Sequence, residues 1–583
     1  MSSLLTRGFL STLIFLFAAL PLRSDDKVLA DFESATYGEW TTEGTAFGDG
    51  PAKGALPNQQ AVSGFRGNRF VNSYHEGDRS VGMLTSQEFE LDRDYLSFLI
   101  GGGRHLGKTG IELLIDGESV RTETGSDAEL LRWKSWDVRE LKGQTARLRI
   151  FDRETEGWGH INVDQIVLTD APRSGSGNWT LESYRHSAEY YRERYRPQFH
   201  FTPELNWMND PNGLVYHEGE YHLFYQHNPH GNSWGHMSWG HAVSTDLVHW
   251  QHLPIALHEE YGVMIFSGSA VVDQQNTSGF SAEGIVPIVA IYTGHSDGLQ
   301  TQNLAFSLDR GRHWTKYAGN PVLDIGEQDF RDPKVFWHEA SSQWVMSVVL
   351  AVQKKVRFYG SPDLKDWKLL SEFGPAGAKQ KANWECPDLL RLPIEGKQNS
   401  FSWVLEADMG SGSIAGGSGG EYFVGDFDGT KFQSQLPTDE ANWVDYGRDF
   451  YAPVSWSNAP HDRKVWLGWM NNWETCLVPT FPWRSAMSLP RDLSLREVNG
   501  KLKLIQRPVP ELQKLRNDHT QFRSGPIEAA QTIDLSDKMS GQQLEILARI
   551  KLPANHQTRF EFRVCRGADE ETLIGYDGTR KEV

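Results

Sequence analysis

A pattern that recurs through the middle of the chain constrains the fold more than any other feature. Three copies have a serine, an aspartate two residues later and a tryptophan shortly after, and a fourth keeps only the acidic turn: Ser244–Asp246 with Trp250, Ser307–Asp309 with Trp314, Ser361–Asp363 with Trp367, and Asp426–Gly429. The copies lie roughly 55 to 65 residues apart, closest to the period of β-propeller blades. Each copy is expected to form a hairpin turn, with its tryptophan packed between blades.

The propeller is expected to occupy residues 196–490, which is room for about five blades. A chain of 583 residues is too long for one core. Its 56 glycines, 26 prolines and 21 tryptophans suit many short strands joined by tight turns. The predicted fold class is therefore all-β, with a five-bladed propeller flanked by an N-terminal jelly-roll-like β-sandwich and a C-terminal β-sandwich.

The segment before the propeller, residues 28–170, alternates short apolar runs with glycine turns, as in Tyr95–Ile100 before Gly101. This pattern is typical of a β-sandwich, and the segment looks like a jelly-roll carbohydrate-binding module. Trp40 and Trp158 are candidate platforms for sugar rings, with core packing as the alternative. Residues 171–195 are polar and are expected to be a linker with room for one helix.

The ends of the chain are expected to differ from its middle. Residues 1–24 combine Arg7 with a short apolar stretch, which indicates a signal peptide and export to the periplasm or the medium. The apolar stretch is too short to span a bilayer, so no membrane span is expected in the mature chain. Residues 495–583 alternate in polarity again, which predicts a C-terminal sandwich that is apparently incomplete.

Charge and cysteine content exclude some partners and some means of stabilisation. The formal net charge of −18 argues against nucleic acid as a partner. Only three cysteines occur, so disulfides are not expected to stabilise an exported chain of this size.

Three acids share one local pattern, in which the acid lies just before a proline and an apolar strand. They occur in Trp207–Gly213, in Phe330–Trp337 and in Asn383–Leu390, as Asp210, Asp332 and Glu385. The innermost strands of all propeller blades meet at the central channel. We therefore expect these three carboxyl groups, although distant in sequence, to converge there.

The same segments resemble glycoside hydrolase family 32, which contains the invertases, levanases and inulinases. The resemblance covers roughly residues 196–495 and includes further motifs in the same order: Phe224–Pro229, Trp239–Ala242, Phe266–Ala270 and Trp483–Met487. It implies a five-bladed propeller followed by a β-sandwich. It also implies cleavage of β-fructosidic bonds.

The resemblance implies a role for each acid. Asp210 matches the nucleophile that forms a covalent fructosyl-enzyme, and Glu385 matches the general acid and base. A retaining mechanism of this kind requires the two carboxyl groups to lie about 5 to 5.5 Å apart. Asp332 matches the residue that stabilises the transition state, and Arg331 is expected to bond the same sugar and keep Asp332 ionised.

Further residues match positions that line the fructosyl site in this family. These candidate substrate-binding residues are Asn209, Gln226, Trp234, Phe266, Ser267, Arg331 and Trp473. Core packing remains the alternative interpretation for Phe266 and Trp473.

A metal site is the competing interpretation of this region, because eight histidines fall between His217 and His252. Their spacing does not match a known zinc motif, since neither His-Glu-x-x-His nor Cys-x-x-Cys is present. No metal and no cofactor are expected.

The sequence thus predicts an exported exo-β-fructosidase acting on levan, inulin or sucrose by a retaining mechanism. One alternative is a fructosyltransferase, which would use the same covalent intermediate but pass fructose to a sugar. The alternative from another class is a noncatalytic fructan-binding or sensor protein. The presence of all three acids argues against that alternative.

Overall fold

The structure is a computed structural model of the whole chain. It describes residues 27–583 except 67, 171, 174, 177–180, 186–189, 194, 283, 297, 379–381, 436, 438, 439, 477, 479, 481, 529, 530, 553–557, 568, 569 and 582. The predicted signal peptide lies outside the described residues, as does part of the predicted linker. The chain divides into two compact units, Met1–Val509 and Pro510–Val583.

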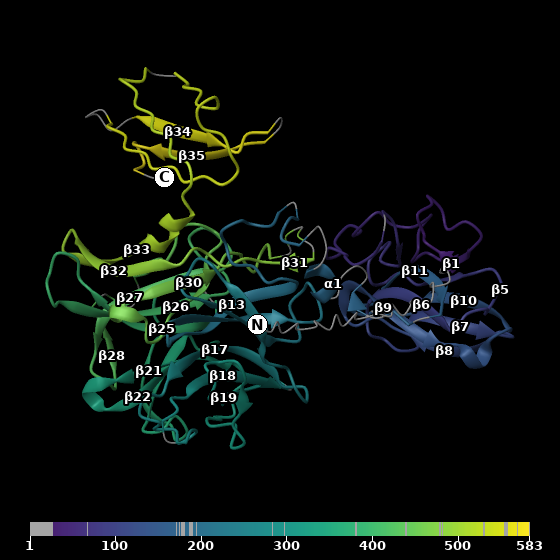
Figure 1. Cartoon of the computed structure of the whole chain (residues 1–583), viewed down its shortest axis with the longest axis horizontal. Coiled ribbons are helices and arrows are strands. Elements are labelled where there is room, and N and C mark those ends of the chain that lie inside the picture. Colours follow the sequence, from purple (N-terminus) through teal and green to yellow (C-terminus); the bar gives the residue numbers. More distant parts are fainter. Residues whose placement is uncertain are drawn as a thin grey trace, which may run out of the picture. The chain divides into compact units, whose positions relative to one another are not determined.

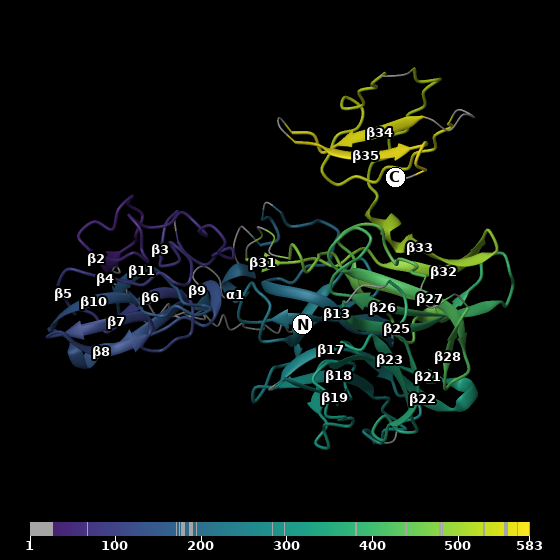
Figure 2. The same ribbon diagram turned by 180° about the vertical axis from the view of Figure 1, so that it is seen from behind.

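Two six-stranded sheets form the N-terminal sandwich, in purple and blue in Figures 1 and 2. The first sheet has the order β1 (Lys27–Ala30), β11 (Ile161–Thr169), β6 (Tyr95–Gly102), β9 (Ala128–Asp137) and β12 (Gly175–Ser176), with β3 (Val71–Asn72) paired to β11. The second has the order β2 (Thr41–Gly44), β4 (Gly82–Thr85), β10 (Thr145–Asp152), β7 (Thr109–Ile115) and β8 (Glu118–Glu123), with β5 (Phe89–Glu90) paired to β10.

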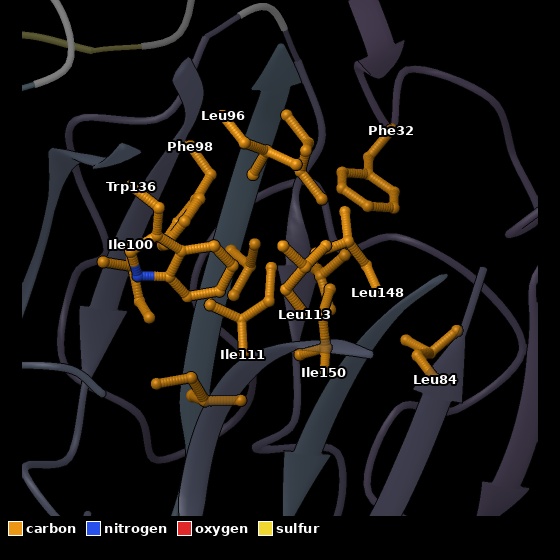
Figure 3. Packing of buried hydrophobic residues seen from close by; sticks show 14 of the residues in the cluster. Phe32, Leu84, Leu96, Phe98, Ile100, Ile111, Leu113, Trp136, Leu148 and Ile150 are labelled. Carbon is orange, nitrogen blue, oxygen red and sulfur yellow. The ribbon is translucent and has the colours of Figure 1, made fainter. Parts of the chain in front are cut away.

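The inward-facing residues of both sheets form one apolar core, shown in Figure 3. Alternate residues of β6, namely Leu96, Phe98 and Ile100, face Ile111 and Leu113 of β7 across the sandwich. Trp40 is partly buried, packs against this core and contacts the Phe32 ring at 5.4 Å. Trp158 is half-buried and stacks on His160.

The segment after the sandwich contains one short helix, α1 (Leu181–Arg185). Arg185 at its end forms a two-pronged ion pair with Glu204, at 2.7 and 2.6 Å. Among the residues the structure describes, no helix is both long enough and apolar enough to cross a membrane.

Five four-stranded blades follow, in teal and green in Figure 1. Blades 1 and 2 are β13 (Asn206–His217), β14 (Glu220–Asn228), β15 (Ser238–Ser244) and β16 (Gln251–Leu257), then β17 (Met264–Val272), β18 (Ile288–Ser296), β19 (Leu299–Ser307) and β20 (Thr315–Lys316). Blades 3 and 4 are β21 (Phe330–His338), β22 (Gln343–Leu350), β23 (Lys355–Ser361) and β24 (Lys368–Phe373), then β25 (Trp384–Pro393), β26 (Phe401–Met409), β27 (Gly419–Phe427) and β28 (Phe432–Ser434). Blade 5 is β29 (Tyr451–Ser455), β30 (Val465–Trp469), β32 (Arg491–Val498) and β33 (Lys501–Pro508).

The propeller closes between its first and last blades. The short strand β31 (Trp483–Arg484), which lies between β30 and β32 in sequence, pairs in parallel with β13. The indole of Trp456, just after β29, donates a hydrogen bond to the His222 carbonyl of blade 1 at 3.0 Å. These contacts join segments that lie more than two hundred residues apart.

The turns predicted from the repeat are present, each between the third and fourth strands of a blade. In the first three copies the serine hydroxyl donates to the aspartate two residues on, at 3.2, 2.9 and 3.1 Å. The tryptophans pack between blades as expected, since Trp314 of blade 2 lies edge-on to Phe224 of blade 1.

The predicted end of the propeller at residue 490 needs correction, because the last two strands of blade 5 run from 491 to 508. The loop between β30 and β32 has little regular structure. When only the sequence is read, a long irregular segment of this kind looks like a domain boundary. The sandwich predicted for residues 495–583, apparently incomplete, is not seen among the described residues of the C-terminal unit. Those residues contain one hairpin, β34 (Arg559–Val564) and β35 (Thr572–Asp577), after a 3-10 helix at Pro510–Leu515.

Candidate active site

The innermost strands of all five blades contribute to one pocket in the central channel. Its lining includes Asn212 of β13, Gly268 of β17, Lys334 of β21, Pro387 of β25 and Val454 of β29. A β-bulge interrupts each of these strands near the pocket, since its pairing with the second strand of its blade shifts there. Bulges re-aim side chains and are common beside active sites.

Four of the five bulges carry the same local sequence, two variable residues followed by proline. These are Asn209-Asp210-Pro211, Arg331-Asp332-Pro333, Glu385-Cys386-Pro387 and Tyr451-Ala452-Pro453. Proline cannot donate a ladder hydrogen bond, so it is tolerated where the ladder is already broken. The residue before proline is left-handed in three of them, with φ of 65° at Asp332, 46° at Cys386 and 50° at Ala452.

Asp210 is held by three donors that converge on its carboxyl group. Ser267 Oγ donates to Oδ2 at 2.7 Å, Asn209 Nδ2 donates to Oδ1 at 3.0 Å, and the Cys386 thiol lies 3.7 Å from Oδ2. Burial raises the pKa of Asp210, and the Ser267 and Asn209 hydrogen bonds oppose that shift. A carboxylate fixed in this way is placed to attack a bound group.

Asp332 and Asp210 both contact the same residue, Cys386. The Cys386 backbone N–H donates to Asp332 Oδ2 at 2.9 Å, while the thiol of the same residue faces Asp210. The Asp332 backbone N–H donates to Thr293 Oγ1 at 2.9 Å. Burial raises the pKa of Asp332 to about 7, against the lowering effect of the Arg331 guanidinium, whose Nε lies 3.8 Å from Oδ2.

Glu385 is bound on both carboxyl oxygens. Arg331 Nη2 donates to Oε1 at 2.9 Å, and the Tyr451 hydroxyl donates to Oε2. Burial, followed by the negative Glu385, raises the pKa of Tyr451 well above its ordinary value, so the phenol keeps its proton. Arg331 is itself fixed by Asp329 at 2.9 Å and Gln300 at 3.3 Å.

The structure therefore connects the three predicted acids in one continuous set of contacts. Cys386 links Asp210 to Asp332, and Arg331 links Asp332 to Glu385. The side chain of Glu385 is the most accessible of the three, with 24% of its surface exposed against 7% for Asp332. This arrangement offers one buried carboxylate for attack and one accessible acid for proton transfer.

The predicted polar substrate-binding residues lie around Asp210. Asn209 is buried and accepts a hydrogen bond from the Trp207 indole at 2.7 Å, which orients its amide toward Asp210. Ser267 lies in the blade 2 bulge. Gln226 lies opposite the blade 1 bulge, where its amide donates to the Ile265 carbonyl at 3.0 Å.

The predicted aromatic residues differ in their exposure and in the rings that they contact. Trp234 is 45% exposed and lies edge-on to Phe266, whose other neighbour is the His295 ring stacked at 4.6 Å. Trp473 packs against Trp207 and Trp469, with centroids at 6.1 and 4.8 Å. Trp473 is thus partly a packing residue, as the alternative interpretation proposed.

Tyr451 was not among the residues predicted from sequence. Its segment carries no acid at the position of Asp210 or Asp332, so it does not share the pattern that singles out the three acids. The proline two residues later was a usable signal, because Tyr451 and Glu385 occupy the same position of the shared pattern.

The histidines that suggested a metal site have other partners. His222 and His241 contact each other at 3.1 Å, His227 bonds the Trp207 carbonyl, and His252 bonds the Tyr191 hydroxyl. Within the described part of the chain, no three His, Cys, Asp or Glu residues are grouped so that they could hold a metal ion. The cysteines are free, with Cys386 buried in the site.

A propeller channel that gathers three carboxyl groups, an arginine and amide side chains defines the class of protein as a glycoside hydrolase. The comparison with protein families places the chain within that class. Residues 200–508 match the glycosyl hydrolases family 32 N-terminal domain, and the chain belongs to this family. The match coincides with the five blades.

Relatives of the chain include a levanase and an exo-inulinase. The chain is 51% identical over 394 residues to a levanase of Bacillus subtilis, covering 67% of this chain and 58% of the levanase. It is 41% identical over 439 residues to an extracellular exo-inulinase of Aspergillus niger, covering 67% of this chain and 79% of that protein. The chain thus spans little more than half the length of the levanase.

Solved structures give the same assignment. The crystal structure of exo-inulinase from Aspergillus awamori matches with a TM-score of 0.52 and 45% identity, over 55% of this chain and 68% of that chain. A fructofuranosidase from Schwanniomyces occidentalis, complexed with fructose, matches with a TM-score of 0.53 and 46% identity, over 55% of this chain and 64% of that chain.

Proposed function

We propose that this protein is an exported exo-β-fructosidase that releases terminal fructose from levan, inulin or sucrose with retention of configuration. The observation that carries the proposal is the contact between the three acids through Cys386 and Arg331 at one end of the channel. The names of the relatives, levanase and exo-inulinase, agree with it. The apolar segment at the N-terminus and the extracellular relative support export.

In the proposed mechanism, Asp210 attacks the anomeric carbon while Glu385 protonates the departing oxygen. Glu385 then removes a proton from water, which releases fructose. Asp332 and Arg331 bond the sugar hydroxyl groups as positive charge develops on the ring. The hydrogen bonds from Asn209 and Ser267 favour the ionised form of Asp210 and fix the orientation of its carboxylate.

Hydrolysis products test the proposal directly. The protein is incubated separately with levan, inulin and sucrose, and released sugars are followed over time. We expect fructose as the only early product from both polymers. Early oligosaccharides would exclude exo action, and transfer products that dominate over free fructose would identify a fructosyltransferase.

The roles of Asp210 and Glu385 are separable with an external nucleophile. We expect Asp210→Ala to lose activity by roughly 10⁴-fold or more, and Glu385→Gln by about 10² to 10⁴-fold. Azide needs no general base, so it should rescue Glu385→Gln on a fructoside with a good leaving group and give a product of retained configuration. With Asp210→Ala, azide should give the inverted product. Full hydrolytic activity of Asp210→Ala would exclude Asp210 as the nucleophile, and no hydrolysis by the wild-type protein would leave only a binding function.

A further inference from the structure

Two buried acids lie directly behind the proposed catalytic centre, and the mechanism above does not use them. They are Glu406 and Asp408 on β26, and each is 0% exposed. In the pairing of β26 with β25, Asp408 lies opposite Glu385 and Glu406 lies opposite Asp388. Because alternate residues of a strand share a face, both carboxyl groups lie on the same side of blade 4.

The two carboxyl groups occupy the same small space. A side-chain carbon added at Gly420 of β27 would lie 2.6 Å from Glu406 Oε1 and 2.8 Å from Asp408 Oδ1. The glycine therefore leaves room that both groups fill. None of their four oxygens has a hydrogen-bond donor of normal geometry among the described residues, although the Ala452 backbone N–H faces Asp408 and opposes the rise of its pKa.

The charged groups that face the pair are almost all acidic. They are Asp388 and Glu385 on β25 and Asp210 on β13, with the protonated Tyr451 on β29; Glu421 of β27 acts on Glu406 only from the other face of the sheet. The nearest cations are committed elsewhere: Lys334 to Ser455 and Asp388, and Arg331 to Asp329 and Glu385. Burial raises the pKa of both acids well above their ordinary values, and the pKa of Asp408 is raised further by Asp210 and Glu385.

Two adjacent carboxylates without a counter-ion are too costly to bury, whereas an acid and a carboxylate satisfy each other through one shared proton. We propose that Glu406 and Asp408 hold one proton between them, and that their single negative charge makes them positioning residues that favour Glu385 as the proton donor. The charge lies across the strand pair from Glu385, so it disfavours a second negative charge there. The inference rests on the proposed function, in which Glu385 is the general acid.

Two substitutions move this charge in opposite directions. In Asp408→Asn the charge remains on Glu406, farther along the strand from Glu385, so the alkaline limb of kcat/KM should move to lower pH by about 0.5–1 unit. In Glu406→Gln the new amide donates to Asp408 and fixes the charge opposite Glu385. The alkaline limb should then stay in place or move to higher pH.

A matched control is Glu421→Gln. Glu421 is equally buried on the adjacent strand, but it pairs with Ala407 in the ladder and accepts a hydrogen bond from the Ala378 backbone at 2.7 Å. It therefore lies on the other face of the blade, and its substitution should leave the alkaline limb unmoved. An unmoved limb in both test variants, or shifts of the same sign, would overturn the proposal.

An infrared measurement tests the shared proton without relying on activity or on both variants folding. At neutral pH the wild-type protein should show a carbonyl band of a protonated carboxyl group that Glu406→Gln lacks. If the difference spectrum between these two proteins contains no such band, the pair is not protonated and the inference fails. Because this readout needs no substrate, its failure is distinguishable from a failure of the proposed function.

Discussion

The acids of the site depend on neighbours that are not acids. Arg331 contacts Glu385, Asp332 and Asp329 with different nitrogens of one planar guanidinium group. Tyr451 caps the other oxygen of Glu385. The fixed fork of a guanidinium can serve several carboxylates at once, which a point charge cannot do.

Substitution of Arg331 by lysine tests this geometry. One ammonium group cannot reach Glu385 and Asp332 while holding Asp329, so we expect kcat/KM to fall by about 10²-fold or more with little change in thermal stability. The control is Arg357→Lys, whose ion pair with Glu372 lies on the outer strands of the same blade. Equal losses in the two variants would show that the effect is general destabilisation.

Substitution of Tyr451 by phenylalanine removes the hydroxyl donor and keeps the ring. The ring still packs against Trp469, so the fold should be retained. We expect kcat to fall by about tenfold, because Glu385 loses the hydrogen bond that orients it for proton transfer. Kinetics that match the wild type would show that the phenol only fills space.

At the scale of elements, the β-bulge is the unit from which the site is built. In blades 2 to 5 the inner strand pairs regularly beyond its bulge, so the bulge changes the direction of two side chains without displacing the rest of the strand. Three non-glycine residues adopt left-handed backbone at these positions. Such conformations are costly and persist only where the surroundings fix them.

Ala452 allows this strain to be tested away from the acids. A β-branched residue disfavours left-handed backbone, so Ala452→Val should destabilise the protein by ~2 kcal/mol and lower kcat by shifting Tyr451. Ala452→Gly can adopt the same conformation and should stay within ~1 kcal/mol of wild type with near-normal kcat. Denaturant unfolding and steady-state kinetics measure both. A valine variant as stable and active as the glycine variant would contradict this account of the bulge.

At the scale of the whole molecule, the N-terminal sandwich carries its own dependence on pH. Asp152 and Asp164 are fully buried in it, and burial raises their pKa values to about 7 and about 8. Both values exceed that of an exposed aspartate, so between about pH 4 and pH 8 the folded sandwich binds more protons than the unfolded chain. The free energy of unfolding should therefore fall as pH rises through this range.

Asp164→Asn tests this prediction. An amide oxygen can still accept the Arg66 backbone N–H that Asp164 binds at 2.7 Å, but it cannot ionise. We expect the variant to be more stable than wild type by ~2 kcal/mol near pH 9 and to show a flatter pH dependence. Asp116→Asn, in the exposed turn between β7 and β8, is the control. A wild-type pH dependence in Asp164→Asn would exclude Asp164 as the cause.

Much of the fold followed from local patterns. The Ser-x-Asp turns predicted hairpins at the correct places, because short polar side chains bond their own backbone wherever they lie. The predicted ends of domains were less accurate. Blade 5 continues to Pro508 because β32 pairs with β30 across an irregular loop and β33 pairs with β32, and pairing over such a distance leaves no local signal.

The sequence by itself determined the blade repeat, the identity of the three acids and their shared position before a proline, since turn chemistry and the absent proline N–H act over a few residues. Only the tertiary structure decided which groups bind those acids. Tyr451 reaches Glu385 because the inner strands of blades 4 and 5 lie side by side at the channel, and Glu406 and Asp408 lie near Glu385 because β26 pairs with β25. Desolvation and charge act through space, so the environment of each acid depends on residues that the sequence places far away.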